Sequence, residues 1–145
     1  MDEAAFRQTL EATHPLLCPF SKALFSGCVA CSQAGRMNLA ERELIVCREA
    51  VLQQRCARMH DALRHNFGFA IHTLHDEAPI PHGQEMRIQC GGLRGLQDVL
   101  RGDAEVTDVD GLMRAVLQNW PEEGDIPFSA VVHAARLHYQ GRHSR

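Results

Sequence analysis

Residues 38–74 read NLAERELIVCREAVLQQRCARMHDALRHNFGFAIHTL and carry the strongest periodic pattern in the chain. Apolar residues recur there at steps of three and four, as on one face of an amphipathic helix. They are Leu44, Cys47, Val51, Leu52, Cys56, Met59, Leu63, Phe67, Ile71 and Leu74. Asn38 and Glu41 have the spacing of a helical capping box. The pattern predicts either one long helix from residue 38 to about residue 74 or two helices with a break near residues 47–50.

Shorter helices are expected on both sides of this segment. Amphipathic spacing places them at residues 2–12, 19–25, 93–100, 108–120 and 127–140. Pro79 and Pro81 predict a loop over residues 76–84. Residues 86–90 alternate apolar and polar, which indicates a short strand or extended segment. The sequence therefore predicts a mainly α fold, a small irregular helical bundle with a Cys-rich loop in its N-terminal half and at most one short extended segment near 86–90.

Length and composition indicate one globular domain. The chain has 145 residues, of which 45% are hydrophobic and 23% charged. We expect a single domain over residues 1–145, with a Cys-rich helical part at 1–75 and a smaller helical appendage at 76–145. No apolar run approaches the length of a transmembrane helix, and the acidic start lacks the features of a secretion signal, so a cytoplasmic location is expected. A net charge of −3 argues against a general nucleic-acid binder.

Six cysteines are many for a chain with no export signal. Their order is Cys18-x9-Cys28-x2-Cys31-x15-Cys47-x8-Cys56-x33-Cys90. Stable disulfides are rare in a reducing cytoplasm, so these thiols are expected to be buried, reactive or metal ligands.

The spacing favours Cys18, Cys28 and Cys31 as metal ligands, with Cys47 or Cys56 as the fourth, since a CxxC pair brings two thiolates to one ion. On a continuous helix Cys47 and Cys56 would face different ways, and both would reach one site only if the helix breaks between them. The alternative for these two is burial as small hydrophobic residues. Cys90 is isolated and is the weakest candidate.

An iron–sulfur cluster, of the 4Fe–4S type, is the expected cofactor, and zinc is the alternative. Proline or glycine stands beside Cys18, Cys28 and Cys90, a neighbourhood common around clusters. The expected function is electron transfer or redox sensing with a protein partner, without nucleic acid or membrane. Two further hypotheses are a zinc-stabilised or metal-free helical adaptor for protein–protein interaction and a thiol redox protein that uses the CxxC pair. No catalytic constellation is identified, so enzymatic activity stays open.

Three other groups of side chains are weaker candidates. A histidine–carboxylate metal site could form from residues near the end of the long segment, His72, His75, Asp76 and His82. His60 follows Cys56 by four positions and would share its helix face. Arginines recur through the middle segment, at Arg36, Arg42, Arg48, Arg55 and Arg58. They indicate either a docking face for an acidic partner or a solvated helix face.

Overall fold

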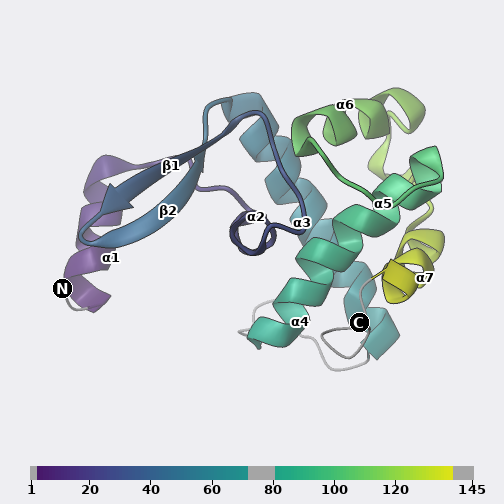
Figure 1. Cartoon of the computed structure of the whole chain (residues 1–145), viewed down its shortest axis with the longest axis horizontal. Coiled ribbons are helices and arrows are strands. Elements are labelled where there is room, and N and C mark those ends of the chain that lie inside the picture. The colour runs from purple at the N-terminus through teal and green to yellow at the C-terminus, as the bar shows by residue number, and fades with distance from the viewer. Residues whose placement is uncertain (1–2, 72–80, 139–145) are drawn as a thin grey trace.

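The structure is a computed structural model, and it describes residues 3–71 and 81–138. The helices are α1 (Glu3–Thr13), α2 (Ser21–Ser26), α3 (Ala50–Ile71), α4 (His82–Met86), α5 (Gly92–Arg101), α6 (Val109–Asn119) and α7 (Phe128–His138). A π-helical turn, Arg87–Gly91, joins α4 to α5, and a short 3₁₀ turn, Glu123–Asp125, precedes α7. The strands are β1 (Ala34–Leu39) and β2 (Arg42–Cys47). The predicted mainly α class is confirmed (Figure 1).

Residues 38–47 do not form the predicted helix. They belong to an antiparallel hairpin in which Ala34 pairs with Cys47 and Leu39 with Arg42. Ala40 and Glu41 form the two-residue turn, with φ angles of 53° and 70°. The β-branched run Ile45–Val46 favours a strand, and Leu39 and Ile45 are buried while their neighbours are not. The apolar steps of three and four in this segment were therefore coincidental, and the helix begins only at α3.

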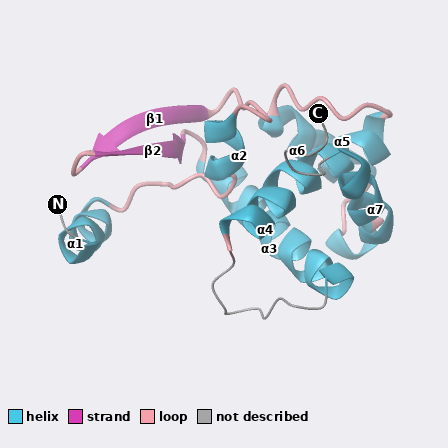
Figure 2. Cartoon of the chain, turned by 60° about the horizontal axis from the view of Figure 1, so that its bottom comes forward, coloured by secondary structure: helices cyan, strands magenta, loops and turns pink. Residues whose placement is uncertain are grey.

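The hairpin and α1 lie to one side of the helical body (Figure 2). Phe6 is the buried residue of α1, and the guanidinium of Arg42 from β2 lies 4.0 Å above its ring. Arg42 also forms an ion pair with Glu3, at 2.8 Å. These contacts between a helix and a strand explain why α1 sits beside the hairpin instead of packing on the main core.

Residues 87–91 are helical, and the predicted extended segment near 86–90 is wrong. Ile88, Gln89 and Cys90 are all buried, so the alternation in the sequence does not correspond to two faces of a strand. The π-helical turn continues α4 into α5 without an interruption of the backbone path. Of the loop predicted over 76–84, residues 76–80 lie outside the described residues, and His82 already belongs to α4.

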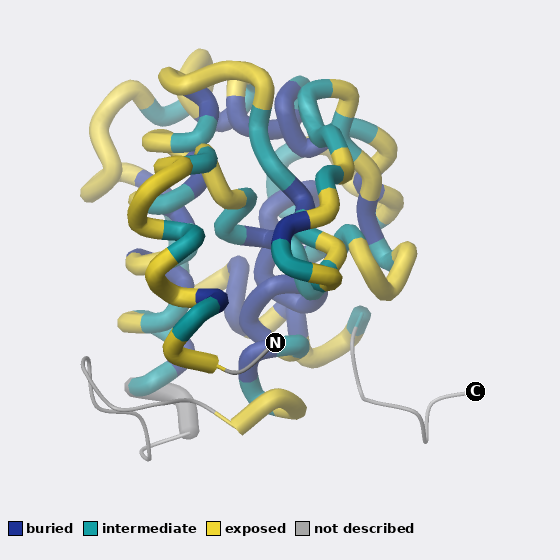
Figure 3. The backbone as a smooth tube through the Cα atoms, turned by 90° about the vertical axis from the view of Figure 1, so that its left-hand side faces the viewer, coloured by how far each residue is buried: buried dark blue, intermediate teal, exposed yellow. Residues whose placement is uncertain are grey.

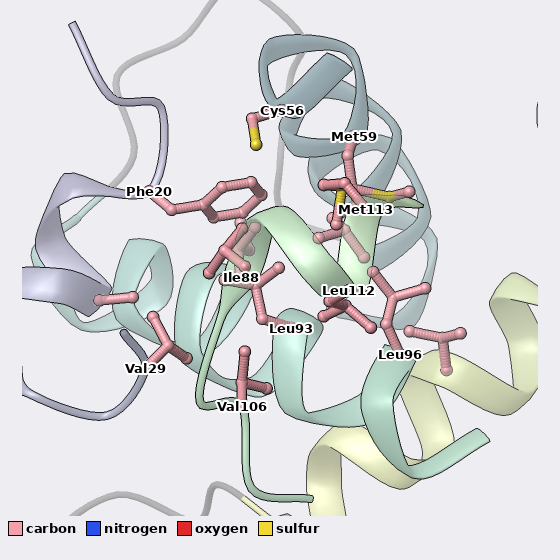
Figure 4. Close-up of a cluster of buried hydrophobic side chains, with 14 of the residues drawn as sticks. Phe20, Val29, Cys56, Met59, Ile88, Leu93, Leu96, Val106, Leu112 and Met113 are labelled. Carbon is pink, nitrogen blue, oxygen red and sulfur yellow. The ribbon is translucent and has the colours of Figure 1, made fainter. Parts of the chain in front are cut away.

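One hydrophobic core connects α3 with the helices that follow it. Its fully buried side chains include Leu63 of α3, Leu93 and Leu96 of α5, and Leu112 of α6, and Phe20 closes it on the side of α2 (Figure 4). In Figure 3 the buried stretches of the backbone lie mainly toward the middle of the molecule and the exposed ones toward its periphery. The core thus joins segments from both halves of the chain.

Within residues 3–71 and 81–138, the structure contains no helix that has both the length and the apolar character needed to cross a membrane.

Candidate thiol site

The six cysteines fall into two chemical groups. Cys28 and Cys90 form a disulfide between residues 62 positions apart, with their Cα atoms 6.1 Å from each other. The other four, Cys18, Cys31, Cys47 and Cys56, are free thiols. Cys90 is completely buried in the π-helical turn, whereas Cys28 is partly exposed in the loop after α2. The disulfide therefore joins a surface loop to the core.

Glycine allows the chain to turn into that loop. Gly27 ends α2 with a φ of 82°, a left-handed conformation that L side chains rarely adopt. The backbone N–H of Cys28 donates to the carbonyl of Ala23 at 3.2 Å. The guanidinium of Arg94 on α5 donates to the Cys28 carbonyl, also at 3.2 Å. These two hydrogen bonds hold Cys28 beside the start of α5. Cys90 lies in the π-helical turn that leads into this helix.

The same loop is bonded to the beginning of α6. The N–H of Ala30 donates to the Val106 carbonyl at 3.2 Å, and its carbonyl accepts from the N–H of Val109 at 2.8 Å. The backbone N–H of Ser32 donates to the carboxylate of Asp108 at 2.9 Å, and the Ser32 hydroxyl lies 3.2 Å from the other carboxylate oxygen. Asp108 is also the N-cap of α6. The loop thus links the disulfide to the N-terminus of α6.

The four free cysteines gather around one small apolar cavity. They come from the segment before α2, the loop after it, the end of β2 and the middle of α3. Phe20, Leu52 and Val109 line the same space, whose volume is about 10 Å³. Figure 4 shows the Cys56 side chain pointing from α3 toward the Phe20 ring. A cavity of this size is at the lower limit for a single water molecule.

Burial keeps most of these thiols protonated. It raises the pKa of Cys18 to about 11, and the neighbouring thiols of Cys31 and Cys47 add to the effect. Burial also raises the pKa of Cys31 and, more strongly, that of Cys56. At pH 7 the Cys18 side chain is therefore mainly in the thiol form, and the thiolate is the nucleophile and the metal ligand. These three thiols are therefore poor nucleophiles at neutral pH.

The structure overturns the iron–sulfur function suggested by the cysteine spacing. Cys28, an expected ligand, has its sulfur in the bond to Cys90. In the part of the chain that the structure describes, no group of three or more histidine, cysteine, aspartate or glutamate side chains is arranged to hold a metal ion. The cavity of about 10 Å³ also leaves no room for a cluster of irons and sulfides. The electron-transfer and redox-sensing roles assigned to that cluster are wrong.

The sequence located part of this site. It singled out Cys18, Cys31, Cys47 and Cys56, which do line one cavity. Zinc, expected at Cys18, Cys28 and Cys31 with Cys47 or Cys56 as the fourth ligand, stays a prediction from the sequence, and it would require release of Cys28 from its disulfide. The pairing of Cys28 was missed, because the CxxC motif pointed to Cys31 and no local pattern connects Cys28 to the distant Cys90.

The histidine candidates have other positions or partners. His72, His75 and Asp76 lie outside the described residues. The Nδ1 of His82 accepts a hydrogen bond from the ammonium of Lys22, at 2.8 Å. His60 does not pair with Cys56, since its Nε2 contacts the carboxylate of Glu85 instead.

Comparison with protein-family models, curated proteins and solved structures finds no match for the chain.

Proposed function

We propose that this chain is a helical protein-binding module whose conformation is controlled by a reversible disulfide between Cys28 and Cys90. The observation that carries the proposal is the separation of the cysteines into one bonded pair and four free thiols. Attack on the bond by Cys18, Cys31 or Cys56 is slow at neutral pH because burial raises the pKa values of these thiols. An external thiol can open the bond at the partly exposed Cys28.

The chemistry of the opening step follows from the exposure of the two sulfurs. A thiolate of a small dithiol attacks the Cys28 sulfur, which belongs to the partly exposed residue, and Cys90 leaves as a thiolate and takes a proton. The second thiol of the reductant then displaces Cys28, which becomes a thiol as the reductant closes into its own disulfide. In the reverse direction, the thiols of Cys28 and Cys90 form the disulfide again. Glutathione disulfide is the oxidant, and it is reduced to two molecules of glutathione that carry the two thiol hydrogens.

Opening the disulfide acts on α6 through the loop. Once Cys28 is free, the loop retains the hydrogen bonds of Ala30 to Val106 and Val109 and those of Ser32 to Asp108. The Ser32–Asp108 bonds are exposed and few hydrogen bonds remain in all, so local opening of the loop becomes easier when the covalent link to the core is lost. The reduced protein then has a more mobile loop and a less firmly held N-terminus of α6.

The proposal includes a cytoplasmic location and a protein partner, with no role for nucleic acid or a membrane. Disulfides in a reducing compartment are usually transient, which is the behaviour that a reversible bond requires. The bond would form only under oxidising conditions. The loop and the N-terminus of α6 would be held more firmly in the oxidised protein than in the reduced protein, and binding of a partner to the helical body would differ between these two states.

Hydrogen exchange tests the proposal. The oxidised protein and a reduced sample are compared by mass spectrometry over residues 28–33 and 106–112. We expect the amides of Ala30, Ser32 and Val109 to exchange roughly tenfold faster after reduction, equal to about 1.4 kcal/mol of local stability. The Cys28→Ser/Cys90→Ser variant should exchange like the reduced protein without added reductant.

Cys47→Ser provides the matched control, since it removes a partly exposed free thiol and leaves the disulfide in place. This variant should keep the difference between oxidised and reduced samples. Equal exchange rates in the two states, with the disulfide shown to be present in one and absent in the other, would contradict the proposal.

A further inference from the structure

An apolar groove runs between α3 and α6, on a side of α3 that the thiol cavity does not use. Met59 and Ala62 of α3 and Met113 and Val116 of α6 line it, and Trp120 closes one end. The groove has a volume of about 130 Å³. Leu117 of α6 also lines it and is 41% exposed, a large value for a leucine beside a core.

The lining residues have the spacing of two helix faces. The α3 side of the groove is lined by residues 55, 58, 59 and 62. The α6 side is lined by residues 113, 116 and 117, and Trp120 follows at the end of this helix. Residues at these intervals lie along one side of a helix. Two such faces meeting at an angle leave a trough of the kind that receives a third amphipathic helix.

Two arginines give the groove a charge. Arg55 and Arg58 are exposed on its α3 side, and neither forms an ion pair with a carboxylate among the described residues. Glu123 lies on the lining as the single acidic side chain of the groove. A ligand that places carboxylates beside these two guanidiniums and apolar side chains over Leu117 and Trp120 would match both features.

We propose that the α3–α6 groove binds an acidic amphipathic helix of a partner protein. This inference deepens the partner-binding part of the proposed function and does not depend on the disulfide. The apolar side chains of the helix, repeated every three or four residues, would cover the exposed Leu117 and the half-buried Trp120, which lie over the buried Met59 and Met113. Its acidic side chains would pair with Arg55 and Arg58.

Trp120 supplies the readout, since it is the only tryptophan of the chain. A synthetic helical peptide with leucines at positions i, i+4, i+7 and i+11 and glutamates along one flank, without tryptophan, is titrated while the emission of Trp120 is recorded. We expect a saturable blue shift as the peptide excludes water from the indole. A peptide with lysines in place of the glutamates should bind roughly tenfold more weakly.

Variants then locate the binding surface. Arg55→Glu/Arg58→Glu should weaken binding of the acidic peptide roughly tenfold or more and reverse the preference toward the lysine peptide. Arg136→Glu, an exposed arginine of α7 outside the groove lining, should leave binding unchanged. Circular dichroism confirms that each variant is folded.

Three results would overturn the inference. One is the absence of saturation by the acidic peptide at millimolar concentration. Another is equal binding of the acidic and lysine peptides. The third is a Trp120 shift that depends on protein concentration alone, which would make a second copy of this chain the occupant. The titration is repeated with the Cys28→Ser/Cys90→Ser variant, so that a failure of the disulfide proposal is distinguished from a failure of the groove.

Discussion

Glu85 shows how single residues hold the helices of this protein together. Its carboxylate is 11% exposed and contacts His60 of α3, and it accepts a hydrogen bond of 2.6 Å from the side-chain amide of Gln89. The Gln89 oxygen in turn accepts from the backbone N–H of Ala23, at 3.1 Å. Burial would raise the pKa of Glu85, but the bonds from His60 and Gln89 outweigh it and hold that pKa below its usual value. The carboxylate is therefore charged and satisfied in the folded protein.

The lowered pKa of Glu85 makes stability depend on pH in the acid range. A carboxyl group with a lower pKa in the folded state stabilises the protein above the unfolded pKa of 4.5, and the contribution is lost as the pH falls through the folded value. We expect Glu85→Gln to reduce the free energy of unfolding by about 1–3 kcal/mol at pH 7 and by clearly less at pH 3. Urea denaturation at both pH values measures this. Glu105→Gln, at an exposed position, is the control, and an equal loss at both pH values would contradict the assignment.

Gly95 marks the closest approach between α5 and α7. A Cβ atom at this position would lie 2.4 Å from the carbonyl oxygen of Val131 and 3.1 Å from the nitrogen of Ala135. Because these are backbone atoms, the helices would have to separate, and we expect Gly95→Ala to cost about 1–3 kcal/mol. Gly83→Ala, in α4, meets no atom within 4 Å and should be neutral or stabilise by up to about 1 kcal/mol. Thermal unfolding of the two variants checks the packing, and equal melting temperatures would refute it.

At the level of elements, the sequence predicted the later helices well and the hairpin not at all. The helices α5, α6 and α7 each carry an amphipathic pattern and lie within a few residues of their predicted bounds. The hairpin was hidden because Leu44 and Cys47 continued the spacing of α3, and its turn contains neither glycine nor asparagine. Residues 87–91 were predicted to be extended, but they form a π-helical turn. Residues 88–91 are all buried, so no amphipathic helical pattern of apolar and polar residues marks this turn in the sequence.

A double substitution in the hairpin turn should change the free energy of unfolding in opposite directions for a hairpin and for a helix. Ala40 and Glu41 both have positive φ angles, which favour asparagine and glycine. We therefore expect Ala40→Asn/Glu41→Gly to increase the free energy of unfolding by about 1–2 kcal/mol. In a helix the same two changes would destabilise by about 1 kcal/mol or more. Chemical denaturation measures the difference, and a loss of stability would favour the helix over the hairpin.

On the scale of the whole molecule, the disulfide is the feature that local sequence patterns cannot reveal. The cavity of four thiols was partly predictable because those cysteines were recognised as a group. The pairing of Cys28 with Cys90 depends on the fold, which brings the loop after α2 onto the turn before α5. The same long-range packing placed Arg55 and Arg58 on a groove, where the sequence alone favoured a solvated helix face.

The disulfide should also contribute to global stability. It closes a loop across 62 positions of sequence, and the chain-entropy model gives about 4 kcal/mol for a loop of that length. We expect the reduced protein, or the Cys28→Ser/Cys90→Ser variant, to be less stable than the oxidised protein by about 2–4 kcal/mol. Urea denaturation with and without a dithiol measures this. An equal midpoint in both conditions would contradict the position of the bond in the fold.

Disulfide mapping tests the central claim most directly. The protein, exposed to glutathione disulfide, is alkylated under denaturing conditions, digested and analysed by mass spectrometry, with zinc and iron measured on the same sample. The account predicts one bond, Cys28–Cys90, four alkylated thiols at Cys18, Cys31, Cys47 and Cys56, and conversion to six thiols by a dithiol. Six thiols under the oxidising condition, a bond between another pair, or stoichiometric metal would contradict it.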